Sequence, residues 1–382
     1  MLIGIDASRT VLARRTGTER YALEITRALT TMTSDDLSDD RFVLYFNQLP
    51  AHGLLPRSDR VSWRVIPSRR LWTVGRLSAE MVIRPPDVLF VPAHSLPPIL
   101  PRASAVTIHD LGYLHFPGEH PPATRLLRQF SNRLSARRAT RVVAISKATR
   151  DDLVRLDRVN PRTISVVHHG KAPWFKPVED AAQIDAVRAR HGLDRPYFLF
   201  VGTLQPRKNL ERLLSAFDRV SAERPDLLLA MVGAGGWQPE RLERALAGVR
   251  ARDRVRLLGY VEDDDLPSLL SGSLGLAFPS LYEGFGLPAL EAMACATPVL
   301  TSNTSSLPEV VGESGLLVDP LDVEAIACGL ARLADDADLR RVLGERGRDR
   351  AAAFTWERAA RETLAVLRAA HHSRAKSDRI SE

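Results

Sequence analysis

Pro279-Ser-Leu-Tyr-Glu-Gly-Phe-Gly-Leu-Pro-Ala-Leu-Glu291 is the stretch of sequence that decides the fold. The apolar residues 274–278 before it predict a buried strand, and residues 288–294 predict a helix with proline in its first turn. The glycines between them let backbone N–H groups approach a ligand closely, and the start of a helix favours an anion. The stretch therefore predicts a binding site for a diphosphate. Glu283 and Glu291 are placed to accept hydrogen bonds from hydroxyl groups on either side of it.

A second anion-binding arrangement lies earlier in the chain. Residues 197–204, Tyr-Phe-Leu-Phe-Val-Gly-Thr-Leu, predict a parallel strand that ends in a glycine turn, and residues 205–210 predict the opening of the next helix. Arg207 and Lys208 then lie at the carboxyl end of a strand, where open α/β sheets bind ligands. A planar guanidinium beside an ammonium suits a diphosphate that gains charge as it leaves. The alternative, two solvated cations at a helix start, is electrostatically unfavourable.

Both stretches resemble motifs of the retaining nucleotide-sugar glycosyltransferases with the GT-B fold, a family that includes bacterial mannosyl- and glucosyltransferases. The first contains that family's pattern of a glutamate, seven residues and a second glutamate. The flanking residues make the match more specific than the carboxylates alone; they are Gly284, Phe285, Gly286, Leu287, Pro288, Ala292, Met293, Ala294, Thr297, Pro298 and Val299. The resemblance is strong over residues 196–319 and looser before them.

The resemblance implies a role for each matching residue. Glu283 would face the donor sugar, and Glu291 would hold the ribose of the nucleotide. Arg207 and Lys208 would stabilise the leaving diphosphate. The other donor-binding residues that it implies are Gly284, Phe285, Gly286 and Leu287, with Tyr260 and Val261 beside the nucleobase.

The chain of 382 residues exceeds the length at which single cores usually stop growing, about 250 to 300 residues, so we expect two domains. The predicted strands are 1–7, 41–46, 87–91, 105–109 and 141–145 in the first half and 197–201, 227–232, 255–258, 274–278 and 298–301 in the second, with helices at 17–30 and 124–138 among those between them. This α/β alternation predicts two Rossmann-like, doubly wound domains. The resemblance implies that they face a central cleft, as in GT-B.

We expect four segments along the chain. Residues 1–172 would form an acceptor-side domain, and residues 173–355 would form the nucleotide-sugar donor domain. The proline- and glycine-containing stretch around residue 170 marks the boundary between them. A helix over 356–372 would return to the first domain, as the resemblance implies, and the polar residues 373–382 would form a disordered tail.

In the first half, Ile108-His109-Asp110 ends a predicted strand, so His109 should lie at the carboxyl edge of the sheet. The resemblance places His109 close to the transferred sugar and Asp110 on the acceptor side. A histidine that only makes structural hydrogen bonds is the alternative. Residues 15–21, Arg-Thr-Gly-Thr-Glu-Arg-Tyr, depart from the glycine-rich turn of relatives. Gly17 can still bring the backbone close to the donor, but the acceptor geometry stays open.

The net charge of +7 is unevenly distributed, because residues 123–150 contain eight basic residues and no acidic one. Leu126, Leu127, Phe130 and Leu134 form one apolar helix stripe in this stretch. One hypothesis is an ordinary helix that packs by its stripe and keeps its cations in water. The other is attraction to an anionic membrane surface or to a lipid-phosphate acceptor. Nucleic acid is disfavoured, because no aromatic platform accompanies the charge.

The remaining sequence features bear on the cellular compartment and on metal binding. Cys295 and Cys328 are too few for a disulfide framework and fit buried helix positions, which indicates a reducing compartment. No apolar run approaches the roughly 20 residues that span a bilayer. We therefore expect a cytoplasmic protein. Under the second hypothesis for the basic stretch, it would attach peripherally to the inner face of the membrane. The acidic run 262–265 precedes a predicted helix, so we interpret it as capping and not as a metal site.

These observations predict a retaining glycosyltransferase that moves a hexosyl unit, mannosyl from GDP-mannose in the first instance, to a glycan or lipid-linked hydroxyl acceptor. The resemblance implies that it needs neither a metal nor another cofactor. Two other classes stay open: a nucleotide-sugar epimerase or phosphorylase on the same frame, and a nucleotide-sugar-binding protein without turnover. Fold alone does not separate them, whereas the identity of the product does.

Overall fold

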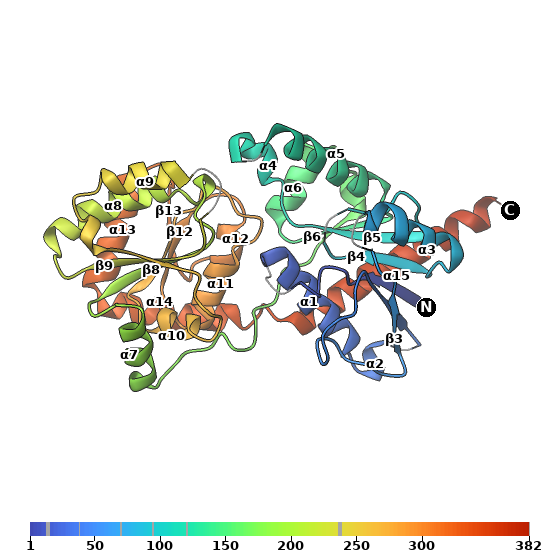
Figure 1. Ribbon diagram of the computed structural model, residues 1–382, viewed down its shortest axis with the longest axis horizontal. Coiled ribbons are helices and arrows are strands. Elements are labelled where there is room, and N and C mark those ends of the chain that lie inside the picture. Colours follow the sequence, from blue (N-terminus) through green and yellow to red (C-terminus); the bar gives the residue numbers. More distant parts are fainter. Residues whose placement is uncertain are drawn as a thin grey trace. The chain divides into compact units, whose positions relative to one another are not determined.

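The structure is a computed structural model that describes residues 1–12, 16–37, 39–68, 71–93, 95–119, 121–235 and 239–381, with the side chains at 34, 35, 239 and 374–381 left out of the description. The chain divides into two compact units (Figure 1). Unit 1 comprises Met1–Leu111, Pro122–Gly170 and Thr355–Glu382, and unit 2 comprises Gly112–Pro121 and Lys171–Phe354.

Unit 1 is built on a parallel sheet, which in the described residues has seven strands in the order β3-β2-β1-β4-β5-β6-β7. The strands are β1 (Leu2–Asp6), β2 (Arg41–Phe46), β3 (Val61–Val65), β4 (Val88–Val91), β5 (Ala103–Ile108), β6 (Arg141–Ala144) and β7 (Ile164–Val166). The helices are α1 (Gly17–Thr30), α2 (Ser34–Leu37), the π-helix η1 (Trp72–Leu77), α3 (Ser78–Ile83), α5 (Pro122–Arg138), α6 (Lys147–Arg155), the 3₁₀ turn η3 (Pro161–Thr163) and α15 (Trp356–Ser381).

The core of unit 1 lies between the sheet and the helices on its two faces. All residues of β4 and β5 are buried, as expected for central parallel strands with both faces covered. Figure 1 shows α1 and α15 on one face and α5 and α6 on the other. The side chains that α15 contributes to the core include Trp356, Ala360, Leu364 and Leu367. This last helix of the chain therefore completes the unit with which the chain begins.

Unit 2 contains the second parallel sheet, with six strands in the described residues in the order β10-β9-β8-β11-β12-β13. The strands are β8 (Tyr197–Val201), β9 (Leu228–Val232), β10 (Val255–Gly259), β11 (Gly275–Phe278), β12 (Val299–Ser302) and β13 (Leu316–Val318). The helices are α4 (Gly112–His115), α7 (Ala181–Arg190), α8 (Leu210–Glu223), α9 (Pro239–Ala247), α10 (Leu266–Ser271), α11 (Leu287–Ala294), α12 (Leu307–Val311), α13 (Val323–Asp335) and α14 (Ala337–Ala351), with the 3₁₀ turns η2 (Pro117–Glu119), η4 (Pro206–Lys208) and η5 (Arg252–Arg254). Helix α8 packs with α9 and α13, and α11 packs with α10, α12 and α14.

The two doubly wound sheets confirm the predicted fold class. Each of the ten predicted strands is present, with ends shifted by at most a few residues. The sequence analysis missed β3, β7 and β13, which are edge strands of the two sheets. Strands at these positions are largely half-exposed or exposed, so they lack the continuous apolar run that marks a central strand.

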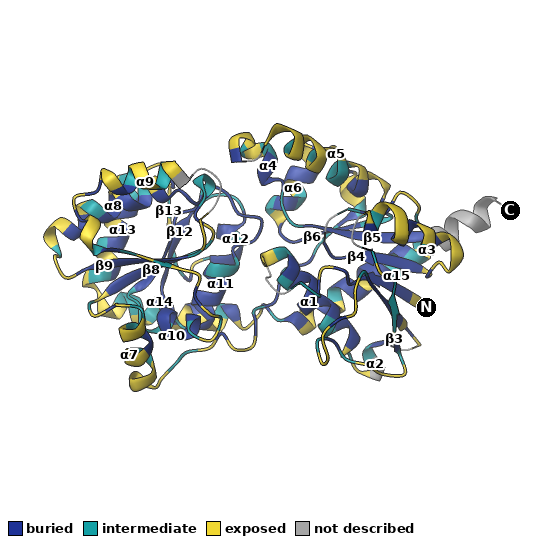
Figure 2. Cartoon of the chain, in the orientation of Figure 1, coloured by how far each residue is buried: buried dark blue, intermediate teal, exposed yellow. Residues whose placement is uncertain are grey.

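Helix α5 exposes its apolar stripe to solvent. The exposed fractions are 67% for Leu126, 68% for Leu127, 64% for Phe130 and 42% for Leu134. Figure 2 shows most of the helix in the colour of exposed residues. The hypothesis that α5 packs by this stripe is therefore wrong.

The two units differ in one segment from the two domains predicted from the sequence, residues 1–172 and 173–355. Gly112–Pro121 packs within unit 2, although the segments before and after it belong to unit 1. The main transition falls between Gly170 and Lys171, and unit 1 resumes at Thr355. Helix α15 is assigned as far as Ser381, beyond residue 372. The expected disordered tail falls mostly on residues outside the described side chains and stays a prediction.

Candidate active site

The backbone between β8 and α8 places two cations at the carboxyl edge of the sheet. Arg207 and Lys208 lie in the 3₁₀ turn η4, and Asn209 then adopts the left-handed conformation with φ 61° before α8 begins. Residues 205–210 therefore lead into the next helix as predicted, with the two cations in a 3₁₀ turn before α8 begins at Leu210. The amide of Asn209 fixes the turn, because it donates to the carbonyls of Pro279 at 2.9 Å and Pro320 at 2.6 Å.

Glu283 joins both cations in one buried ion cluster. Its Oε1 lies 2.5 Å from Lys208 Nζ, and its Oε2 lies 3.1 Å from Arg207 Nη1. Glu283 and Lys208 are each 6% exposed. Burial alone would raise the pKa of the Glu283 carboxyl, but the charges of Lys208 and Arg207 outweigh it and hold this pKa below its usual value. The cluster is therefore an ionised carboxylate held between two cations.

A second carboxylate, which the sequence analysis did not single out, reaches the same turn. Oε1 of Glu119 accepts a hydrogen bond of 2.5 Å from the backbone N–H of Arg207, and its Oε2 lies 3.7 Å from Arg207 Nε. Glu119 is 6% exposed. Nearby in the same segment, the ring of His115 stacks on Tyr282 with 4.5 Å between centroids. The segment Gly112–Pro121 therefore supplies one carboxylate to the cluster and one ring that packs on the adjacent Tyr282.

Hydroxyl groups support the loop that carries Glu283. The Ser305 hydroxyl accepts from the Glu283 N–H at 3.0 Å, and the Ser306 hydroxyl donates to the Glu283 carbonyl at 2.9 Å. Thr301 donates to the carbonyl of Phe278 at 2.7 Å, at the end of β11. The run Thr-Ser-Asn-Thr-Ser-Ser over 301–306 was the available sequence signal, since short hydroxyl side chains satisfy exposed backbone groups.

The other sequence-predicted donor residues follow in unit 2. Gly284, Phe285 and Gly286 are buried and Leu287 is half-buried. Gly286 has a φ of 105°, and a Cβ there would approach Leu307 Cδ2 to 2.8 Å, so this turn requires glycine.

Two further predicted donor residues lie at the carboxyl end of the edge strand β10, and a third lies on α11. Tyr260 follows β10 and is 70% exposed, whereas the next residue, Val261, is 3% exposed. An exposed aromatic ring at this edge can stack on a nucleobase. Glu291 lies on the second turn of α11 and is 7% exposed.

The candidate residues of the first half belong to unit 1. His109 follows β5, and its Nε2 donates to the Pro92 carbonyl at 2.9 Å, which places a proton on that nitrogen. Thr149 Oγ1 donates to the His109 carbonyl at 3.2 Å. Asp110, the next residue, is half-buried. Gly17 is exposed at the start of α1.

An aromatic cluster lies behind His109. The Tyr21 ring meets His109 edge-on at 4.9 Å and stacks on His169 at 4.6 Å, and Trp356 lies 5.8 Å from His169. Burial, with smaller contributions from His109 and His168, holds the pKa of His169 well below its usual value. His169 is therefore a neutral core side chain that supports the ring of His109.

The acidic run 262–265 directly precedes α10, as predicted, but a capping hydrogen bond is not formed by Asp265, which occupies the N-cap position. Its side chain instead accepts from His191 at 2.9 Å and lies 3.4 Å from Arg190 Nη1. Among the residues that the structure describes, no group of three or more His, Cys, Asp or Glu side chains could hold a metal ion. Asp265 therefore links the start of α10 to the end of α7 through an ion pair with Arg190.

The two cysteines differ in their surroundings. Cys295 is buried at the end of α11, as predicted, but Cys328 on α13 is exposed, so its predicted burial is wrong. Burial raises the pKa of the Cys295 thiol to about 12, which leaves it unreactive. No helix in the described part of the chain combines the length and the apolar character that a membrane crossing requires.

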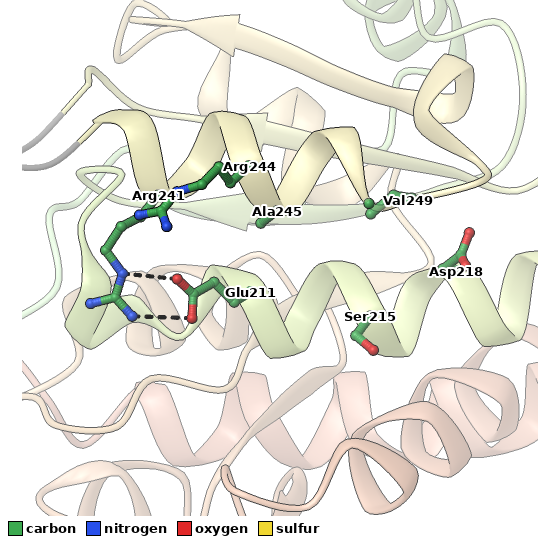
Figure 3. A pocket seen from close by; sticks show the side chains of 8 residues that line it. Glu211, Ser215, Asp218, Arg241, Arg244, Ala245 and Val249 are labelled. Carbon is green, nitrogen blue, oxygen red and sulfur yellow. Dashed lines mark hydrogen bonds and ion pairs between the residues drawn. The ribbon is translucent and has the colours of Figure 1, made fainter.

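A cavity of about 460 Å³ lies between α8 and α9 (Figure 3). Arg241 and Glu211 face each other in it through two hydrogen bonds of 2.9 Å and 3.1 Å. Its other lining residues are Ser215, Asp218, Arg244, Ala245, Gly248 and Val249. Arg241 and Glu211 match each other's charge in this cavity.

Comparison with known proteins identifies the family. Residues 183–350 match the family model of glycosyl transferases group 1, and residues 15–171 match that of glycosyltransferase family 4. The O-antigen chain mannosyltransferase B of Escherichia coli is 30% identical over 362 residues, which cover 91% of this chain and 95% of that protein.

Solved structures show the same fold. Sucrose-phosphate synthase from Thermosynechococcus elongatus superimposes with a TM-score of 0.74 at 24% identity, covering 96% of this chain and 98% of that one. Anabaena HepE in complex with UDP and glucose gives a TM-score of 0.70 at 18% identity, covering 95% and 99%. These likenesses confirm the GT-B fold. The chain therefore belongs to the group 1 glycosyltransferases.

Proposed function

We propose that this glycosyltransferase moves a hexosyl unit from a nucleoside diphosphate sugar to a hydroxyl acceptor, with retention of configuration and without a metal ion. GDP-mannose is the first candidate donor, because a relative that aligns along nearly the whole chain is named as a mannosyltransferase. The same relative's name refers to an O-antigen chain, which supports a glycan acceptor; a lipid-linked acceptor is the other form that we propose.

The observation that carries the proposal is the ion cluster of Arg207, Lys208 and Glu283. A diphosphate needs two or more cationic donors, and this turn presents a guanidinium and an ammonium side by side. The same pair can stabilise the charge that develops on the diphosphate as its bond to the sugar breaks. Basic side chains therefore take the place that a divalent ion holds in other phosphate sites.

Glu283 would act on the sugar. Its low pKa keeps it ionised at neutral pH, so it can stabilise the positive character that the anomeric carbon gains when the diphosphate departs. His109 would contact the transferred sugar, and Asp110 would lie on the acceptor side. Glu291, Tyr260 and Val261 would bind the nucleoside, and Gly17, Gly284, Phe285, Gly286 and Leu287 would line the rest of the donor site.

The proposed step exchanges one bond at the anomeric carbon for another. The bond between the anomeric carbon and the diphosphate oxygen breaks, and a bond to the acceptor oxygen forms on the same face of the sugar. The acceptor's proton passes to the departing phosphate oxygen. Arg207 and Lys208 stabilise this oxygen before it takes the proton. No side chain of the protein needs to form a covalent bond.

A thermal-shift comparison of GDP-, UDP- and ADP-sugars tests donor binding. A donor at 100 times its dissociation constant should add about 2.7 kcal/mol of stability. Product analysis then separates the alternatives: transfer gives a new glycoside, an epimerase gives an altered nucleotide sugar, and a binding protein gives neither. A chain that binds none of these sugars would contradict the proposal.

A further inference from the structure

The guanidinium of Arg207 meets different acceptors at its two ends. Its Nη1 donates to the carbonyl of Tyr282 and to Oε2 of Glu283, each at 3.1 Å. A terminal guanidinium nitrogen carries two protons, so these two acceptors engage both of them. A phosphate that binds two nitrogens of this guanidinium must therefore take the edge formed by Nε and Nη2. Glu119 faces that edge, with its Oε2 at 3.7 Å from Nε.

Glu119 makes the contacts that a phosphate group would make at this place. Its Oε1 accepts from the backbone N–H of Arg207 at 2.5 Å, while its Oε2 faces the guanidinium of the same residue. Arg241 on α9 also lies within electrostatic reach of Glu119. Glu119 is 6% exposed, so these charges interact largely away from water, where their attraction is stronger. The carboxylate is therefore an internal anion on Arg207.

The segment that carries Glu119 can move without breaking a sheet. Gly112–Pro121 packs within unit 2, whereas the residues before and after it belong to unit 1. Its elements are the short helix α4 and the 3₁₀ turn η2, and no strand of either sheet comes from it in the part of the chain that the structure describes. Withdrawal of Glu119 from Arg207 would therefore cost no ladder hydrogen bond.

We propose that Glu119 is a positioning residue of the donor site, which holds Arg207 in place and yields its edge of the guanidinium to the diphosphate of the donor. Because the diphosphate must displace a carboxylate, Glu119 lowers the affinity of the site for diphosphates. The return of Glu119 to Arg207 then favours departure of the nucleoside diphosphate product. This inference rests on the proposed function, since it takes Arg207 as a ligand of the diphosphate.

Calorimetric titration of the full chain with GDP, UDP and ADP tests the displacement. Glu119→Gln keeps an oxygen for the N–H of Arg207 but removes the competing charge. Glu313→Gln is the matched control, because Glu313 is exposed and precedes β13, at the amino edge of the sheet and away from the carboxyl edge that binds ligands. Thermal unfolding without nucleotide checks that each variant remains folded.

We expect Glu119→Gln to bind the preferred nucleotide about tenfold or more tightly than the wild type, because the negative charge 3.7 Å from Arg207 Nε is removed. The Glu313→Gln control should bind like the wild type. Equal or weaker binding by Glu119→Gln would overturn the proposal.

A double-mutant cycle with Arg207→Ala separates displacement at the guanidinium from a general effect of charge. Arg207→Ala keeps the backbone N–H that binds Glu119 and removes the guanidinium. In this background, Glu119→Gln should tighten binding by about threefold or less. The same gain with and without Arg207 would contradict the proposal, because Glu119 would then act on the whole site and not through Arg207.

Hydrogen exchange of the wild type provides a measurement that needs no variant. Added nucleotide should speed exchange in residues 112–119, because Glu119 has released Arg207, and should slow exchange in β8 and η4. Unchanged or slower exchange in residues 112–119 would count against displacement and overturn it.

The proposed function and the role of Glu119 fail in different ways. If none of the three nucleotides binds, or if Arg207→Ala binds them like the wild type, the diphosphate does not use Arg207, and both proposals are wrong. If Arg207→Ala weakens binding but Glu119→Gln does not strengthen it, the proposed function stands and the role of Glu119 alone is wrong.

Discussion

Nζ of Lys208 lies 2.5 Å from Oε1 of Glu283, and both side chains are almost completely buried. Arg207 completes the cluster at 3.1 Å from the other carboxylate oxygen. The Glu283 carboxylate offsets part of the positive charge that Arg207 and Lys208 would present to a diphosphate. The catalytic proposal depends on this pairing, because it keeps the cations in place and the carboxylate ionised.

Arg207→Ala and Lys208→Ala should each lower turnover by about 100-fold or more, because each would remove a cation that stabilises the leaving diphosphate. Steady-state kinetics with the donor found by thermal shift measures this. Arg341→Ala, at an exposed site on α14, is the matched control and should turn over like the wild type. Near-native turnover in a folded Arg207 or Lys208 variant would remove that residue from the mechanism.

Glu119→Ala should destabilise unit 2 by about 1 to 3 kcal/mol, because it leaves the buried N–H of Arg207 without its acceptor. Glu119→Gln keeps an acceptor oxygen, so this variant should lose less stability than Glu119→Ala. Urea unfolding of the wild type and both variants measures the difference. If the wild type and the alanine variant have the same urea midpoint and the same dependence of unfolding free energy on urea, Glu119 does not fix the turn.

Glu283→Gln should destabilise the protein at neutral pH by about 3 to 5 kcal/mol, because it removes the buried negative charge that pairs with Lys208 and Arg207. The pKa of Glu283 is lowered in the folded state, so its stabilising contribution is present above the unfolded pKa of about 4.3 and is lost as pH falls through the folded value. The stability gap between wild type and variant should therefore narrow in acid. A gap that stays constant to low pH would contradict the lowered pKa.

His169→Phe should make the free energy of unfolding depend less on pH. The pKa of His169 is lowered in the folded state, so below about 6.5 the unfolded chain binds a proton that the folded chain does not. Wild-type stability should fall by up to about 1.4 kcal/mol per pH unit from this residue, and the phenylalanine variant should lack that part. Parallel stability curves from pH 7 to about 5 would rule this out.

Transfer should persist in excess EDTA, because basic side chains supply the charge for the leaving diphosphate. The assay compares chelated enzyme with enzyme to which magnesium or manganese is added back. Activity that disappears with EDTA and returns with either ion would show that a metal takes part.

The sequence predicts the central strands and the donor cluster because both leave local signals. Buried parallel strands are continuous apolar runs, and Arg207, Lys208 and Glu283 sit in glycine-containing passages from strand to helix. No local sequence signal marks Glu119, because its partner Arg207 lies 88 residues away. In addition, the segment Gly112–Pro121 that contains Glu119 belongs to unit 2, although the stretches before and after it belong to unit 1. The apolar stripe of α5, formed by Leu126, Leu127, Phe130 and Leu134, can be read from the sequence. Hydrophobic periodicity does not, however, distinguish a buried helix face from an exposed one.

The anomeric configuration of the first product tests the central claim most directly. In ¹H NMR, the enzyme with its α-linked donor, GDP-mannose in the first instance, should release an α-linked product, either on an acceptor sugar or as free α-mannose from slow transfer to water. The spectrum should show the α-anomeric signal before mutarotation produces the β form. A β-configured first product, an epimerised nucleotide sugar, or no turnover of any donor that binds would contradict the account.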